Sequence, residues 1–330
     1  MTHHLKAYGW TYTGDGVDIY IIDSGVRATH DEFTSWSGSR VTTGRNFSGD
    51  SKASTDTEPC ISHGTSVASL AAGNTVGVAR GATVVPVRVS PCDASQPWTW
   101  GNINLWGAIQ AVDWVIEQRQ LYSRPSVINM SFYKLDPDDD IYECAPNPEG
   151  NPTSCLDSFE SQIQGAIANG ITIVASANNQ DRDNCNVQTP ARLGYGNETL
   201  YPASGRTITV GGTDIENEDY YCANCLDQDR GSNRGPCVSF YAPADRIKSA
   251  SIESNNAYRD RTDQTVSSGT SFASPIVAGA AARWLDQYPW LTPAQVWYWL
   301  QQTATSLGPA DFDGDGISEN NRLLYIDVYH

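Results

Sequence analysis

The stretch Val17-Asp18-Ile19-Tyr20-Ile21-Ile22-Asp23-Ser24-Gly25 is a short, mostly apolar run that ends in a carboxylate, a serine and a glycine. Its β-branched residues and its turn-forming end are typical of a strand. Four later runs have the same character. We therefore predict strands over residues 17–22, 83–89, 126–130, 171–175 and 207–211.

Helical patterns separate these strands. One stretch places Leu105, Ile109, Val112 and Ile116 at spacings of three and four, which forms one apolar face of a helix. In the last long helix we expect Pro275 in the first turn, where its missing N–H costs little. The predicted helices cover residues 64–73, 104–120, 157–169, 272–287 and 293–303.

This alternation of strands and helices predicts an α/β fold with a central, mostly parallel sheet flanked by helices. The 330 residues show no internal repeat and no long linker, so we expect one domain over residues 1–330. A stretch rich in acids and prolines, about 134–157, is interpreted as a loop insertion in that domain.

Composition excludes several classes of function. The formal charge of −17 argues against nucleic-acid binding, which needs clustered Lys and Arg. No apolar run approaches the roughly 20 residues that span a bilayer. The opening residues 1–6 lack the pattern of a signal peptide, so we expect a mature form or a missing targeting segment. The eight cysteines lack the spacing of a zinc site and favour disulfides in an oxidising compartment.

Three short motifs contain an acid, a base and a hydroxyl in this order along the chain. Asp23 ends the first strand, His63 lies in Cys60-Ile61-Ser62-His63-Gly64-Thr65-Ser66, and Ser271 lies in Ser268-Gly269-Thr270-Ser271-Phe272-Ala273-Ser274-Pro275. Alone, each has a structural explanation: Asp23 as a turn former, His63 as a packed or capping residue, Ser271 as a helix N-cap. Together they predict a nucleophilic triad in which His63 takes the Ser271 proton and Asp23 orients the imidazole.

The three motifs and their neighbours resemble the subtilisin-like serine proteases (peptidase S8 family), and most closely the proteinase K and aqualysin branch. The resemblance extends from Gly16 to Tyr325. It implies a three-layer subtilisin-like fold and a secreted serine endopeptidase that hydrolyses peptide bonds through an acyl-enzyme. It also implies protein or peptide substrates, a monomer, and a propeptide that this chain does not contain.

The family completes its oxyanion hole with a side-chain amide. The turn after the fourth strand, Ala175-Ser176-Ala177-Asn178-Asn179, matches the family's Ala-Ala-Gly-Asn and assigns this role to Asn179, with the Ser271 N–H as the second donor. Asn178 stands where relatives have glycine. Asn tolerates a left-handed backbone better than most residues, so we expect the turn to be kept, with Asn178 as the alternative donor to the oxyanion.

Relatives bind an extended peptide between two backbone segments. Trp100, Gly101 and Asn102 match one segment, and Ser131, Phe132 and Tyr133 stand where the other reads Ser-Leu-Gly. Tyr133 and Lys134 stand where relatives have two glycines, and we expect these larger side chains to narrow or reshape the pocket for the residue before the cleaved bond. The acidic insertion that follows suggests a preference for basic residues near the cleavage site; a solvated loop is the alternative.

The resemblance also implies two disulfides, Cys60–Cys92 and Cys185–Cys237. The remaining cysteines then pair as Cys144–Cys155 and Cys222–Cys225. We expect no cofactor for the chemistry, although relatives commonly bind structural calcium. Asp311, Asp313 and Asp315 form a candidate calcium loop, but Arg322 at the twelfth position rules out an EF-hand, and a plain acidic turn is the alternative.

Two other functions use the same scaffold. A non-catalytic binding protein would not need an acid–base pair beside a nucleophile, so the complete set of residues argues against it. An esterase or transpeptidase would use the same triad, and only the leaving group would distinguish it from a protease.

Overall fold

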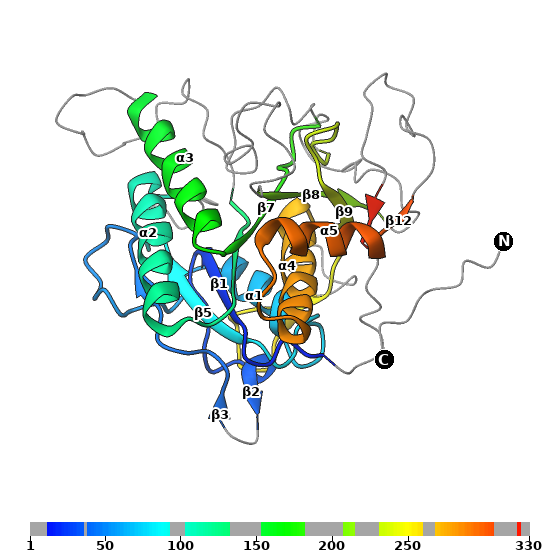
Figure 1. Ribbon diagram of the computed structural model, residues 1–330. Helices are drawn as coiled ribbons and strands as arrows, with labels where there is room; N and C mark the ends of the chain where they lie inside the picture. Colours follow the sequence, from blue (N-terminus) through cyan, green and yellow to red (C-terminus); the bar gives the residue numbers. More distant parts are fainter. Residues whose placement is uncertain are drawn as a thin grey trace.

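A large sheet runs through the centre of the molecule (Figure 1). The computed structural model describes residues 12–35, 38–92, 103–132, 153–181, 207–214, 231–259, 268–306 and 322–324. Within these ranges the sheet has nine strands in the order β12-β13-β9-β8-β7-β6-β1-β5-β4. Neighbouring strands are parallel, except for the antiparallel pair at one edge, β12 (Thr305–Ser306) and β13 (Arg322–Leu323).

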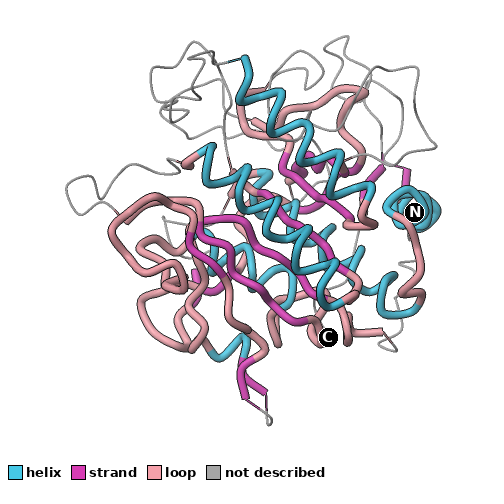
Figure 2. Tube along the Cα trace, turned by 60° about the vertical axis from the view of Figure 1, so that its left-hand side comes forward, coloured by secondary structure: helices cyan, strands magenta, loops and turns pink. Residues whose placement is uncertain are grey.

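The strands of the sheet's centre are those that the sequence predicts, with ends that differ by at most two residues. They are β1 (Asp18–Asp23), β5 (Thr83–Arg88), β6 (Ser126–Met130), β7 (Thr172–Ser176) and β8 (Ile208–Thr213). β4 (Arg45–Asn46) and β9 (Phe240–Pro243) extend the sheet on either side. Figure 2 shows these strands side by side.

Helices cover both faces of the sheet and make three layers. α1 (His63–Ala72), α4 (Thr270–Gln287) and α5 (Pro293–Thr303) pack on one face, and α2 (Leu105–Tyr122) and α3 (Thr153–Ala168) pack on the other (Figure 1). Successive residues of β1 alternate between the two cores: Ile19 and Ile21 lie with α1 and α4, and Tyr20 and Ile22 lie with α2. The predicted α/β class is therefore confirmed.

Short elements complete the described part of the chain. They are the 3₁₀ helix η1 (Asp31–Phe33) and two small hairpins, β2 (Thr34–Ser35) with β3 (Gly38–Ser39) and β10 (Ser249–Ala250) with β11 (Tyr258–Arg259).

Two helices begin two or more residues earlier than predicted. α3 begins at Thr153, so the predicted insertion 134–157 overlaps its first turn. α4 begins at Thr270, which places Pro275 in the second turn and not in the first. Proline has no N–H, so the Ser271 carbonyl lacks the donor that the helix would otherwise supply. The sequence suggested a later start because Ser271 looks like a capping residue, whereas the N-cap is Gly269.

The order of the strands determines where a site can form. β1 lies between β5 and β6, so the chain moves from β1 to one neighbour and then crosses to the other. In parallel α/β sheets, ligands bind outside the carboxyl ends of the strands at such a switch point. Asp23 is the last residue of β1, directly at that position.

Candidate active site

Asp23 and His63 form a tightly held pair at the switch point. The Nδ1 of His63, the first residue of α1, lies 2.8 and 3.0 Å from the two carboxylate oxygens of Asp23. The Asp23 side chain is only 3% exposed, and its Oδ1 also accepts the Ser24 N–H at 2.7 Å. This geometry places the imidazole proton on Nδ1 and leaves Nε2 as the acceptor.

Small residues allow this close approach. A Cβ added at Gly64 would lie 3.0 Å from the Asp23 Oδ1 and 2.3 Å from the Gly25 carbonyl oxygen, so no side chain fits there. The Gly64 N–H donates to the Ser24 Oγ at 3.0 Å, which joins the start of α1 to the end of β1.

The environment of His63 changes its basicity. Burial lowers the pKa of the ring, but the charge of Asp23 and the hydrogen bond to it raise the pKa by more, so the net shift is upward. The ring is therefore a stronger base than a free imidazole.

Ser271 reaches the same place from a distant part of the sequence. It is the second residue of α4 and follows Gly269, whose φ of 129° needs a glycine. The ring of the next residue, Phe272, packs against His63 with ring centroids 5.7 Å apart. The Ser271 Oγ donates to the Ser131 carbonyl at 2.9 Å. Its N–H has no acceptor in the described part of the chain, as expected for a first-turn amide.

Asn179 completes the group. Its Oδ1 accepts the Thr270 N–H at 2.8 Å and the Thr270 hydroxyl at 3.1 Å, which leaves its NH₂ without a partner among the described residues. The preceding Asn178 differs: it is 2% exposed, its φ is 78°, and its buried Nδ2 has no partner among the described residues. The structure therefore places the free amide donor of Asn179, and not that of Asn178, next to the start of α4.

An acid–base pair, a hydroxyl and two N–H donors, which have no acceptor in the part of the chain that the structure describes, thus lie at the carboxyl edge of a parallel sheet. The family model of the subtilase family matches residues 14–318. The chain belongs to the subtilase family.

Known relatives agree with this assignment. The subtilase is 34% identical to "Extracellular serine proteinase" of Thermus sp. (strain Rt41A) and 33% identical to "Alkaline serine exoprotease A" of Vibrio alginolyticus, in each case over 96% of this chain. It spans only 62% and 47% of the lengths of these two relatives. A crystal structure of a cold adapted subtilisin-like serine proteinase matches with a TM-score of 0.67 and 32% identity, over 96% of this chain and 90% of that one.

The predicted substrate segments of the subtilase are only partly described. Trp100, Gly101, Asn102 and Tyr133 lie outside the described residues. Ser131 is 1% exposed and offers its carbonyl to Ser271. The side chain of Phe132 packs in the core between the sheet and α2 and α3, 6% exposed. Tyr133 and Lys134, the residues expected to reshape the substrate pocket, lie outside the described residues, so that expectation stays a prediction.

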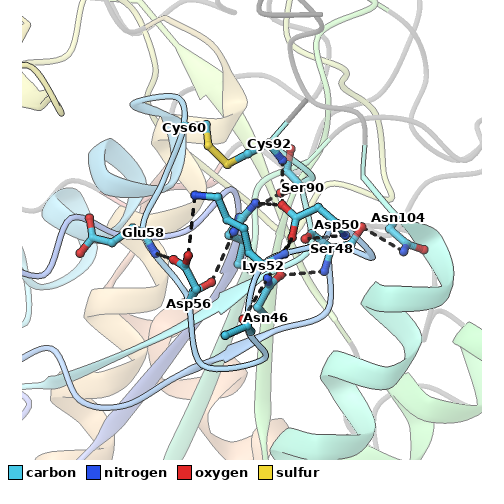
Figure 3. A network of polar contacts seen from close by, with 12 residues as sticks. Asn46, Ser48, Asp50, Lys52, Asp56, Glu58, Cys60, Ser90, Cys92 and Asn104 are labelled. Atoms are coloured by element: carbon cyan, nitrogen blue, oxygen red, sulfur yellow. Dashed lines mark hydrogen bonds and ion pairs between the residues drawn. A yellow bond between two sulfur atoms is a disulfide. The ribbon is translucent and has the colours of Figure 1, made fainter. Parts of the chain in front are cut away.

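Cys60 and Cys92 form a disulfide, with Cα atoms 5.7 Å apart (Figure 3). Cys237 is also disulfide-bonded, but its predicted partner Cys185 lies outside the described residues. Cys222, Cys225 and the side chains of Cys144 and Cys155 lie outside them too, so these pairings stay predictions.

Sequence reasoning missed a polar network beside this disulfide. Arg88, fully buried at the end of β5, forms an ion pair with Asp50. Asp50 also accepts the Cys92 N–H at 3.0 Å, the Asn46 amide at 3.2 Å and the Lys52 N–H at 3.1 Å (Figure 3). These contacts fasten the 46–56 loop to β5. No local sequence signal predicts the pair, because its two residues are 38 positions apart.

The described residues contain no group of three side chains that could hold a metal ion. The candidate calcium residues Asp311, Asp313 and Asp315 lie outside the described ranges. None of the helices in those ranges combines the length and the apolarity needed to cross a membrane.

Proposed function

We propose that this subtilase is a serine endopeptidase that hydrolyses peptide bonds by a Ser271–His63–Asp23 triad. One observation carries the proposal: the buried Asp23 carboxylate holds the His63 ring by Nδ1, while the Phe272 ring, directly after Ser271, packs on that imidazole. The names of relatives and the family membership support a protease over other acyl-transfer enzymes.

In the first step His63 Nε2 removes the proton of the Ser271 hydroxyl, and Oγ attacks the carbonyl carbon of a peptide bond. The Oγ now donates to the Ser131 carbonyl, so it must rotate about the Cα–Cβ bond to face the imidazole. Such catalytic hydrogen bonds often form only when substrate is bound. The negative charge of Asp23 stabilises the imidazolium that results.

The attack produces a negatively charged carbonyl oxygen. The Asn179 NH₂ and the Ser271 N–H are the free donors beside it, and we assign both to the oxyanion hole. Their orientation is set before the reaction, since Thr270 holds the amide oxygen of Asn179.

His63 then gives its proton to the leaving amine as the C–N bond breaks, which leaves an ester on Ser271. His63 takes a proton from a water molecule, whose oxygen attacks the ester carbon. As the ester C–O bond breaks, His63 gives this proton to the Ser271 Oγ, which releases the new carboxylic acid and restores the serine hydroxyl. Each step uses groups of this chain and water, so the proposed chemistry requires no cofactor.

The wider properties belong to the same proposal. We infer an extracellular monomer with residues 1–330 as one catalytic domain, made with a propeptide. The names of relatives, such as "Alkaline extracellular protease" of Yarrowia lipolytica, support the extracellular site of action. Structural calcium at Asp311, Asp313 and Asp315 rests on the pattern of acids alone.

Cleavage-site profiling tests this function. The purified chain and its Ser271→Ala variant are incubated with a denatured proteome, and the new amino termini are sequenced. We expect internal cleavages with the wild-type chain only. Cleavage by the Ser271→Ala variant at the same sites and rates would contradict the proposal.

The same profile tests the role of the acidic insertion. Asp136, Asp138, Asp139 and Asp140 follow the predicted substrate segment 131–133 directly. We propose that their charge favours Arg or Lys near the cleaved bond. A profile without enrichment of basic residues would end this part of the proposal.

A further inference from the structure

The turn that carries Asn179 has an unfavourable backbone. Asn178 has a φ of 78° and Asp181 a φ of 56°, so two non-glycine residues within four positions are left-handed. This conformation costs free energy for residues with a Cβ, and it persists only where the surrounding structure enforces it. Contacts from elsewhere in the chain must therefore hold the turn.

Asn233 supplies these contacts. It is fully buried, and its backbone N–H donates to the Asn178 carbonyl at 2.8 Å. Its Oδ1 accepts the Gln180 N–H at 3.0 Å, and its Nδ2 donates to the Gln180 Oε1 at 3.1 Å. One residue thus binds the backbone immediately before and immediately after Asn179.

The segment around Asn233 is itself anchored. The Ser232 Oγ accepts the Gly212 N–H at 2.9 Å and donates to the Asn233 carbonyl at 2.8 Å, which ties the segment to β8. The Gly231 carbonyl accepts the Asp181 N–H at 3.1 Å, and Arg234 forms an ion pair with Asp181. β8 pairs in turn with β7, the strand from which the turn leaves (Figure 1).

Asn179 is therefore fixed from two directions. Thr270 holds its amide oxygen from the side of α4, and Asn233 holds its backbone from the side of β8. The NH₂ that remains has no partner in the described part of the chain, so its direction follows from these two anchors.

We propose that Asn233 is a positioning residue for the oxyanion hole, a role that rests on the proposed protease function. It keeps the turn in its left-handed conformation so that the Asn179 NH₂ meets the charge that develops on the substrate carbonyl oxygen. Such donors act on the transition state and only when they are placed accurately; a misplacement of about 1 Å can cost roughly 10²-fold in rate. Loss of Asn233 is then expected to lower kcat more than it changes KM.

A double-mutant cycle tests this role. Asn233→Ala, Asn179→Ala and the double variant are assayed with a peptide substrate, and kcat is normalised to active sites titrated with phenylmethanesulfonyl fluoride. We expect Asn233→Ala to lower kcat by about 10- to 100-fold with KM changed less than about threefold. In the Asn179→Ala background the same substitution is expected to cost less than about threefold, because the group that it positions is gone.

Two further variants separate positioning from stability. Ser239 is fully buried and accepts the Thr209 N–H at 3.3 Å, so Ser239→Ala is a matched loss of a buried polar contact away from the turn. It is expected to lower Tm and leave kcat per titrated site unchanged. If Asn233→Ala does not fold, Asn233→Asp takes its place in the cycle, since it keeps an acceptor for the Gln180 N–H.

The inference is overturned if Asn233→Ala lowers kcat by the same factor with and without Asn179, or if it leaves kcat unchanged. The proposed function fails by a different result: hydrolysis by Ser271→Ala at the wild-type rate. The two failures are therefore distinguishable in one set of assays.

Discussion

At the scale of single residues, the site depends on what each polar atom is already bonded to. Nδ1 of His63 is committed to Asp23 and Oδ1 of Asn179 to Thr270, so Nε2 and the NH₂ are the groups left for chemistry. The surroundings of the side-chain amide also distinguish Asn179 from Asn178, whose amide is buried in the turn.

Asp23→Asn removes the charge beside His63. We expect kcat to fall by roughly 10⁴, the effect of such a substitution in another serine protease. The ring must be neutral to act as a base, so kcat/KM rises with pH through its pKa. Asp23 raises that pKa and burial lowers it, so the acid limb of the profile is expected to move to lower pH in the variant. A pH profile of kcat/KM checks this shift. An acid limb at the same pH as in the wild type, or at a higher pH, would contradict it.

Asn178→Gly tests which asparagine serves the oxyanion. Glycine adopts the φ of 78° without strain and removes a buried amide whose Nδ2 has no partner in the described ranges, so we expect stability to rise by about 1 kcal/mol. We expect the kcat of Asn178→Gly to stay within about threefold of the wild-type value, whereas Asn179→Ala is expected to lower kcat by roughly 10²–10³-fold. Urea unfolding and steady-state kinetics measure both. A large loss of kcat in Asn178→Gly would reverse the assignment.

At the scale of elements, the loops that bring side chains to the sheet edge are held by contacts remote in sequence. The Asp50–Arg88 pair fastens the 46–56 loop to β5, one strand away from Asp23. Burial raises the pKa of Asp50. The opposing effects are larger: hydrogen bonds from the Cys92 N–H, the Asn46 amide and the Lys52 N–H, together with the charge of Arg88, lower the pKa to below the ordinary range.

Asp50→Ala leaves the Arg88 guanidinium buried without its partner. We expect a loss of about 3–5 kcal/mol in the free energy of unfolding at neutral pH. The matched control is Asp56→Ala, which breaks the exposed pair with Lys52 at 3.7 Å and is expected to cost less than about 1 kcal/mol. The Asp50 contribution is present above the ordinary Asp pKa and lost as pH falls through the lowered folded value, so the difference between wild type and variant shrinks in acid. Equal losses in the two variants would refute this account.

At the scale of the whole molecule, the sheet brings residues 23, 63, 179 and 271 together from four segments. The Cys60–Cys92 disulfide closes a separation of 32 residues that includes α1 and His63. In the chain-entropy model, a loop of this length is stabilised by about 3–4 kcal/mol.

Cys60→Ala with Cys92→Ala removes this cross-link. We expect the free energy of unfolding to fall by about 3–4 kcal/mol, with kcat kept within about threefold in the folded fraction. Guanidinium unfolding with active-site titration measures both quantities. An unchanged unfolding midpoint would show that the bridge contributes no stability.

The sequence predicts the central strands well, but it predicts poorly the long-range contacts that hold the loops in place. The apolar runs from Val17 onward locate the central strands because both faces of these strands are buried. The side-chain direction of Phe132, just past the end of β6, follows from packing and not from a local pattern. Asn233 acts on Gln180 from 53 residues away, and Arg88 on Asp50 from 38, so neither contact leaves a signal in the neighbouring sequence.

The most direct test of the central claim is covalent labelling of the intact, folded chain with phenylmethanesulfonyl fluoride, followed by mass spectrometry of its peptides. A nucleophile activated by His63 is expected to carry the sulfonyl group on Ser271 alone, with loss of peptide hydrolysis in proportion to the label and no label in His63→Ala. Active enzyme with Ser271 unmodified, or equal labelling of other serines, would contradict the account.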